Sequence, residues 1–342
     1  MFEQVFQKYL TVKNILFTIG VIFFILFIFS VPEISLMFFA AFVIACSLEP
    51  FVKRLMPRFN RSMASVIVLM GAILFICAFF VPLIIIGAHE VSAFAEGFPL
   101  YIDAAKNLLD SSQLINLSSG TVNFDIGGII SSITGTTSKL FTETLTAGKN
   151  IGSAFVYILV SILIIFYFMS DGEKVKKNIL RLFPSNIRGK TASIVDSIAQ
   201  RSGGYVIAQI ITMSSVGIIV SLGLFVLGNE YSLLLGLISA VFDIVPIVGP
   251  AVAFVICIMS VIKSDTISII LTALVFATAQ LVENNLVRPY VFSKFLDLHP
   301  LIIYLFIFIA AKYMGVIGVI FAPAIAATVV VLLEEIYIKN ME

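Results

Sequence analysis

The chain has 342 residues, of which 60% are hydrophobic and 12% are charged, with a formal net charge of +1. A soluble domain carries roughly a quarter charged residues, and the mean hydropathy here is +1.11, so the composition excludes an ordinary soluble protein. Several apolar runs reach the ~20 residues that a helix needs to cross a bilayer, whereas a barrel would show short alternating segments. We therefore expect an all-α polytopic membrane protein.

The apolar runs predict two kinds of membrane segment. Full helical spans are expected at 14–31, 34–49, 62–88, 150–170, 203–228 and 266–287. Two further regions, 231–262 and 299–333, are too long for one span, and each is interrupted near its middle. The interrupting residues are Pro246, Gly249 and Pro250 in the first region and Lys312, Gly315 and Gly318 in the second. Each region predicts a broken helical hairpin, which either spans twice with short arms or enters and returns from one face.

The distribution of charge predicts the topology. Lys and Arg are frequent from Lys53 to Arg61 and from Lys174 to Arg201, and such segments stay in the cytoplasm. Acidic residues outnumber lysines in 89–149, which therefore belongs outside. Counting spans from these anchors puts both termini in the cytoplasm and gives the two hairpins opposite orientations, with 231–262 opening outward and 299–333 opening inward.

Four parts follow from this topology. We expect N-terminal spans in 1–88 and a small extracytoplasmic amphipathic region in 89–149, where apolar residues recur with weak helical periodicity. A span and a basic cytoplasmic segment occupy 150–202. The transport core, with both hairpins, occupies 203–342.

Asp243 is the strongest candidate for a functional residue, because it directly follows the first predicted arm of the hairpin 231–262. A charge at membrane depth costs at least a few kcal/mol unless it is sheltered, and a half-helix C-terminus adds negative partial charge. We expect Asp243 to hold a proton or attract a cation. The alternative is a capping role toward the free amides from Ile247 to Pro250.

A polar stripe is predicted near the end of the span 266–287. Gln280 and Asn284 are four residues apart and share a helix face with Arg288, while Glu283 and Asn285 flank that face. In lipid such a stripe must face protein or water, which favours a pathway wall. The alternative is an interfacial pair in which Arg288 extends to the headgroups and binds Glu283.

Other polar residues carry weaker hypotheses. Gln209 either binds a hydroxyl group of a solute or joins two helices. His299 either handles protons or makes a local hydrogen bond at a helix N-terminus. Lys312 either extends to the outer interface or pairs with a buried carboxylate. Glu49 is a secondary candidate whose simpler role is an ion pair with Lys53.

Enzyme chemistry lacks its usual motifs. Gly189-Lys190-Thr191 resembles the end of a phosphate-binding loop, but Pro184 occupies the position of its first glycine. Neither His-Glu-x-x-His nor Gly-x-Ser-x-Gly occurs. We expect no enzyme, no cofactor, no metal site and no nucleic-acid partner, and we interpret the three cysteines as small apolar residues.

Several motifs in the C-terminal part occur in a characteristic order. They are Ser202 to Gln209, Leu235-Gly236-Leu237, Asp243 to Pro250, Gln280 to Pro289, Lys294, Leu298 to Leu301, and Gly315 to Gly318 with Pro323. In sequence and spacing they resemble the autoinducer-2 exporter family of prokaryotic membrane proteins. The resemblance implies a homo-oligomeric secondary transporter in the cytoplasmic membrane. Some members are connected with export of autoinducer-2, and others with exchange of sodium or lithium for protons.

The combined expectation is a lipid-embedded exporter of a small polar solute that works by alternating access. Asp243 and Glu283 would be the sites for Na⁺ or H⁺, and Gln209, Asn284 and Asn285 would form neutral walls. One alternative is a sodium(lithium)/proton antiporter. An alternative of another class is a membrane scaffold in envelope or spore assembly that transports nothing.

Overall fold

The structure is a computed structural model that describes residues 30–78, 81, 151–262, 264–296 and 298–337, with only the backbone described at 151–154 and 336. The predicted span 14–31, all but its last two residues, and the predicted region 89–149 lie outside the described residues, as do both termini.

Helices make up the described part of the chain, which contains no strand. They are α3 (Pro32–Leu55), an unlabelled helix Arg61–Ala78, α6 (Ile151–Leu182), α7 (Arg188–Val226), α8 (Ser232–Phe242), α9 (Val248–Ser260), α10 (Thr266–Val282), η3 (Glu283–Val287), α11 (Arg288–Phe292) and α12 (Pro300–Ile336). Six of these segments are long and apolar enough to cross a membrane. The expectation of an all-α polytopic membrane protein is confirmed.

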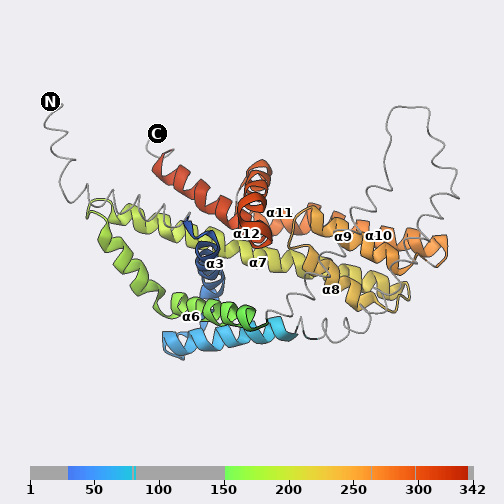
Figure 1. Ribbon diagram of the computed structural model, residues 1–342, viewed down its shortest axis with the longest axis horizontal. Coiled ribbons are helices and arrows are strands. Elements are labelled where there is room, and N and C mark those ends of the chain that lie inside the picture. The colour runs from blue at the N-terminus through green and yellow to red at the C-terminus, as the bar shows by residue number, and fades with distance from the viewer. Residues whose placement is uncertain (1–29, 79–80, 82–150, 263, 297, 338–342) are drawn as a thin grey trace.

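Helix α7 is the element on which the others pack. It has 39 residues and so extends over about 58 Å at 1.5 Å per residue, more than the hydrocarbon core requires. Helices α3, α6 and α12 contact α7, and so do α8, α10, η3 and α11. Figure 1 shows α3 and α6 near one half of α7 and α8, α9 and α10 near the other half.

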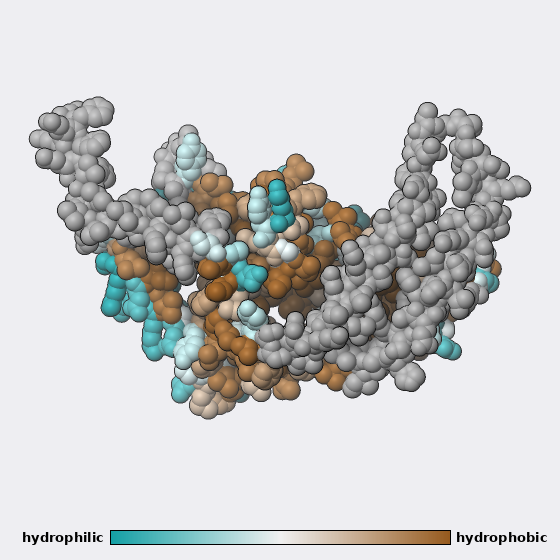
Figure 2. Space-filling view, viewed as in Figure 1, coloured by the Kyte–Doolittle hydropathy of each residue, from teal (hydrophilic) through white to brown (hydrophobic). Residues whose placement is uncertain are grey.

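The basic segment after the fourth predicted span is helical. Helix α6 continues to Leu182 and α7 begins at Arg188, so only a short turn separates them. The predicted spans 150–170 and 203–228 were therefore too short on the side of this turn. Hydropathy marks where a helix leaves lipid, but the backbone hydrogen bonds continue in water. Hydrophilic residues gather at this end of the molecule, whereas hydrophobic residues dominate much of the visible coloured surface (Figure 2).

The first predicted hairpin is present as α8 and α9, which pack against each other. The break is at 243–247, between the two helices, and contains Pro246. Gly249 and Pro250 are instead in the first turn of α9, where a proline removes no intrahelical hydrogen bond. Ile247, at the tip, has φ 69°, which is unusual for a β-branched residue.

The second predicted hairpin also breaks. The backbone of α12 is non-helical at Gly315, where φ is 62° and ψ is −156°. Only glycine adopts this conformation readily. Lys312 and Gly318 are on the helical arms beside the break. Whether the two hairpins have opposite orientations in a membrane stays a prediction.

Small residues let α8 approach α7 closely. A Cβ atom added to Gly236 would be 2.6 Å from the carbonyl oxygen of Gly217 and would overlap the Ser221 hydroxyl. A Cβ atom on Gly217 would be 2.9 Å from the Ala240 methyl group. In lipid there is no hydrophobic driving force for helices to associate, so their association depends on close van der Waals packing of this kind.

Three groups of buried residues hold the helices together. One joins α7, α8, α9 and α10; a second joins α3, helix Arg61–Ala78 and α6; a third joins α3, α7 and α12. Because α7 contributes to the first and third groups, it fixes the hairpin α8–α9 relative to α12.

Substitution of Gly236 tests the close contact between α7 and α8. We expect Gly236→Val to lower the free energy of unfolding by about 1–3 kcal/mol, because the added methyl groups overpack the contact. Gly71→Ala is the matched control, since a Cβ atom there meets nothing within 4 Å. Thermal unfolding of the detergent-solubilised protein, followed by circular dichroism, should show a lower midpoint for Gly236→Val alone. Equal midpoints for the two variants would contradict this packing.

Candidate functional site

Three elements bring polar side chains together at one point of the bundle. Helix α7 contributes Gln209, the bend between α8 and α9 contributes Asp243, and η3 contributes Glu283. Arg288, the first residue of α11, connects the two acids. We call Gln209, Asp243, Glu283 and Arg288 the carboxylate cluster.

Asp243 is buried without a hydrogen-bond donor for its carboxylate. Its side chain is 1% exposed, and neither Oδ atom accepts a hydrogen bond from the described residues. Its nearest cationic atom is Nη2 of Arg288, 3.9 Å from Oδ1. The main-chain carbonyl of Asp243 accepts a hydrogen bond of 3.1 Å from Nε2 of Gln209. Gln209 therefore holds the bend of the hairpin against α7.

The capping role considered for Asp243 is not what the structure shows. Helix α9 begins at Val248, its N-cap residue is Ile247, and no side chain caps its amides. The carboxylate of Asp243 lies instead beside Arg288. Asp243 directly follows α8, and α9 begins only later in the chain. The partner of the Asp243 carboxylate is therefore Arg288, beside η3, and not the free amides of α9.

Glu283 and Arg288 form the closest ion pair of the cluster. Glu283 is 1% exposed, and its Oε1 accepts a hydrogen bond of 2.9 Å from Nε of Arg288 and a second from Nη2. Its Oε2 has no hydrogen-bond partner. Arg288 also lies over the ring of Phe292, 5.6 Å from the centroid. One guanidinium therefore serves two buried acids.

A π-helical turn makes this pairing possible. The amide of Arg288 donates to the carbonyl of Glu283, five residues earlier, in η3. This wider turn places residues five apart on one side of the helix, unlike an α-helix, where residues four apart coincide. π-helical turns are rare in proteins overall, but those that occur are often found at functional sites. Glu283 thus faces the bundle together with Arg288.

The same turn corrects the predicted polar stripe. Asn284 and Asn285 are exposed, and Nδ2 of Asn285 donates to the carbonyl of Leu281 in its own helix. Within the described residues, neither side chain makes a hydrogen bond or ion pair with the carboxylate cluster. Gln280 is partly buried, and its Nε2 is buried without a hydrogen-bond partner.

The two acids of the cluster lie beside the same guanidinium. Oδ1 of Asp243 is 3.9 Å from Nη2 of Arg288, and Oε1 of Glu283 accepts hydrogen bonds from Nε and Nη2. Two carboxylates and one guanidinium leave one negative charge that a proton or a bound cation would compensate. Within the described ranges, no three His, Cys, Asp or Glu side chains gather as a metal site.

The weaker candidates lie outside the cluster. Nδ1 of His299 accepts from the amide of Leu301 at 3.3 Å, which is the local hydrogen bond considered for it. Lys312 is exposed, with its ammonium 5.4 Å from the centroid of the Tyr313 ring. Oε1 of Glu49 lies 3.8 Å from Nζ of Lys53, which is the ion pair considered for it, and Glu49 also forms an ion pair with Arg61.

Tyr205 is a further residue that reaches the site from α7, although its residue type alone did not indicate a role there. Its side chain is buried, its hydroxyl donates to the carbonyl of Ile320 at 2.7 Å, and its ring meets Phe292 edge to face. Tyr205 thereby ties α7 to the second arm of α12 and supports the ring that lies under Arg288. Its spacing of four residues from Gln209 was a signal that could have indicated a shared helix face.

Removal of Arg288 tests whether it compensates the buried acids. We expect Arg288→Gln to lower the free energy of unfolding by about 3–5 kcal/mol, because it leaves buried carboxylates unpaired. Arg201→Gln is the matched control, since its partner Glu334 is far more exposed and such pairs contribute about 0–1 kcal/mol. Adding Glu283→Gln to Arg288→Gln should recover part of the loss. Similar thermal midpoints for the two single variants would refute the assignment.

Comparison with known proteins identifies the family. The model of the family described as AI-2E family transporter matches residues 15–338. The putative transport protein YueF of Bacillus subtilis is 24% identical over 336 residues, which cover 91% of this chain and 90% of YueF. The putative transport protein YrrI of the same organism is 25% identical over 178 residues, about half of each protein.

A further relative carries a more specific name. The sodium-lithium/proton antiporter of Halobacillus andaensis is 24% identical over 331 residues, which cover 92% of this chain and 94% of that protein. The family model spans both broken hairpins and the complete carboxylate cluster. Because six helices in the described ranges are long and apolar enough to cross a membrane, the chain is a multi-pass membrane protein, and it belongs to the AI-2E family of transporters.

Proposed function

We propose that the protein is a secondary transporter that exports a small polar solute by alternating access, driven by a proton or cation held between Asp243 and Glu283. The observation that carries the proposal is the burial of Asp243 with both carboxylate oxygens free of donors. An unpaired ionised carboxylate is too costly at membrane depth to persist without a function or a ligand.

The charge of the cluster supports an exchange of single positive charges. Arg288 compensates one of the two carboxylates, and the other requires one proton or one monovalent cation. A proton can be shared between the two acids, whereas a small cation can use the free oxygens Oδ1 and Oδ2 of Asp243 and Oε2 of Glu283. Either ligand removes the uncompensated charge, so binding one displaces the other.

The position of the cluster supports coupling to movement. Asp243 is in the break of the hairpin α8–α9, and Gln209 holds that break to α7. Broken helices place ion and solute sites where two parts of a transporter meet. A change in the charge of Asp243 therefore acts directly on the contact between the hairpin and η3. Gln209 and Gln280 supply amide groups near this contact, and the amide of Gln280 has no partner of its own.

The family name makes autoinducer-2 the first solute to test, and a homo-oligomer in the cytoplasmic membrane with cytoplasmic termini is the expected setting. The second candidate function is exchange of Na⁺ or Li⁺ for H⁺, because the Halobacillus andaensis relative carries that name over nearly the whole chain. Under this alternative the same two acids bind the metal ion and the proton in turn.

Flux through proteoliposomes tests the role of Asp243. We expect Asp243→Asn to remain folded and inserted, with coupled flux reduced to that of empty liposomes, because an amide carries no exchangeable charge. Asp265→Asn is the matched control, since this exposed aspartate precedes α10 and hydrogen-bonds Ser268. Unchanged flux in Asp243→Asn, with an intact elution profile, would sink the proposal.

The same liposomes distinguish the candidate functions. If the protein exports the solute in exchange for protons, a pH-sensitive dye in the lumen should respond to a pulse of autoinducer-2 and not to NaCl or LiCl. A response to NaCl and LiCl but not to KCl would establish the antiporter instead. A protein that moves neither solute nor ions would favour the scaffold alternative.

A further inference from the structure

A second polar space lies away from the carboxylate cluster. It is a cavity of about 570 Å³ between α3, α6 and α7, with Arg61 at one side. Phe42, Ala45, Phe168 and Val195 provide apolar lining. The charged side chains on its walls are Glu49, Lys53, Arg61, Glu173, Lys176 and Asp196. Three are acidic and three are basic, so the walls carry both signs and no net charge.

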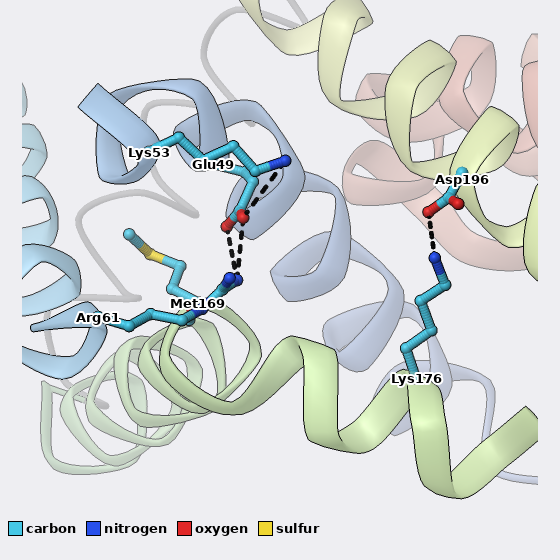
Figure 3. A network of polar contacts seen from close by, with 6 residues as sticks. All are labelled: Glu49, Lys53, Arg61, Met169, Lys176 and Asp196. Carbon is cyan, nitrogen blue, oxygen red and sulfur yellow. Dashed lines mark hydrogen bonds and ion pairs between the residues drawn. The ribbon is translucent and has the colours of Figure 1, made fainter. Parts of the chain in front are cut away.

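One ion pair at the wall is firmly held. Nη2 of Arg61 binds both carboxylate oxygens of Glu49 at 2.9 and 3.0 Å, and Nε of Arg61 donates to the carbonyl of Met169 at 2.9 Å. Both side chains are about four-fifths buried, at 21% and 23% exposure. Figure 3 shows these contacts joining α3, the start of helix Arg61–Ala78 and α6. On this side of the cavity, the hydrogen bonds of Arg61 therefore hold three helices together.

The other ion pair is weakly held. Lys176 extends from α6 to Asp196 on α7, with Nζ 2.5 Å from Oδ1 (Figure 3). Asp196 is 66% exposed and Lys176 is 24% exposed, and this is the one contact that Lys176 makes with Asp196. A single ion pair with one largely exposed partner contributes little to stability and opens readily. Both residues line the cavity, so its wall contains a contact between α6 and α7 that breaks at small cost.

The cavity and the carboxylate cluster follow one another along α7. Asp196, Ala199 and Gln200 line the cavity, whereas Gln209 contacts the cluster. Between them, Gly203 packs on α3 so closely that a Cβ atom would be 2.7 Å from the carbonyl carbon of Cys46. This close crossing of α7 and α3 lies, along α7, between the residues that line the cavity and Gln209.

We propose that the cavity is a vestibule for small polar solutes without net charge, and that the Lys176–Asp196 pair is the strut that restricts entry to it. Walls of both signs offer hydrogen-bond donors and acceptors to such a solute, and because the charges balance they add no net attraction for an anion or a cation. The apolar lining accommodates its carbon skeleton. This inference rests on the proposed transport function. The crossing of α7 and α3 at Gly203 is the barrier between the vestibule and the carboxylate cluster.

A native cysteine reports on this space. Cys46 lines the cavity and is partly buried, Cys77 is exposed, and Cys257 is buried. In a Cys77→Ser background, the rate at which a membrane-impermeant thiol reagent modifies Cys46 measures entry to the cavity. Adding Cys46→Ser to that background is the control, because Cys257 is then the one cysteine that can react and its signal can be subtracted. The probes are neutral glucosyloxyethyl, cationic trimethylammonioethyl and anionic sulfonatoethyl methanethiosulfonates, each normalised to its rate with free mercaptoethanol.

Removing either end of the strut should speed entry. In membrane vesicles exposing the face with the α6–α7 turn, we expect Lys176→Gln and Asp196→Asn each to raise the rate about two- to fivefold. The exchanged pair, Lys176→Asp with Asp196→Lys, should return the rate toward the starting value. Lys174→Gln is the matched control, because it breaks a pair of similar length with Asp171 on the same helix that does not line the cavity.

The results separate this inference from the function proposed for the cluster. The neutral probe should react fastest, and this order of the three rates should persist in Asp243→Asn even though that variant stops flux. Equal normalised rates for the three probes would overturn the solute class. Equal rates in the strut variants and in Lys174→Gln would overturn the strut. Failure of Cys46 to react from this face in any variant would overturn the vestibule.

Discussion

Two buried carboxylates, those of Asp243 and Glu283, share a single guanidinium, and the architecture around them is arranged by that constraint. Arg288 compensates one of the two negative charges, and we propose that a proton or a cation compensates the other. Such a site cannot face lipid, because unpaired charge there is too costly. Burial of the site therefore requires close packing of three elements around it: the bend between α8 and α9, the π turn of η3 and helix α7. Gln209 fastens the bend to α7 through the main chain of Asp243, so the carboxylate itself stays available.

Several of the described membrane helices contain irregular backbone. The break at 243–247, the π turn from Glu283 to Val287 and the non-helical Gly315 each interrupt a span. In a bilayer such interruptions persist only where protein or water satisfies the exposed backbone groups. Helix α7, by contrast, is continuous over 39 residues, and its glycines and serines bring α8 into close contact. The molecule thus combines one long regular support with several deformable partners, an arrangement suited to alternating access.

Two different ion-pair environments serve two different purposes. Around Arg61 the hydrogen bonds are several and largely buried, and they hold three helices together. The contact between Lys176 and Asp196 is single and partly exposed. The free energy of breaking an ion pair depends on how many bonds it makes and how much water reaches it. The first pair therefore stabilises the bundle, whereas the second is free to open.

The sequence by itself determined the membrane class, most of the spans in the described part, both breaks and the choice of Asp243 and Glu283 as buried acids. These follow from local properties: hydropathy, helix-breaking residues and the cost of charge in lipid. Only the tertiary structure decided the partners. Arg288 pairs with Glu283 at a spacing of five because a π turn widens the helix, and this turned Asn284 outward against an expectation based on α-helical periodicity. The contact between Gln209 and the main chain of Asp243, 34 residues apart, was likewise beyond sequence periodicity, because it arises from the folding of one helix across another.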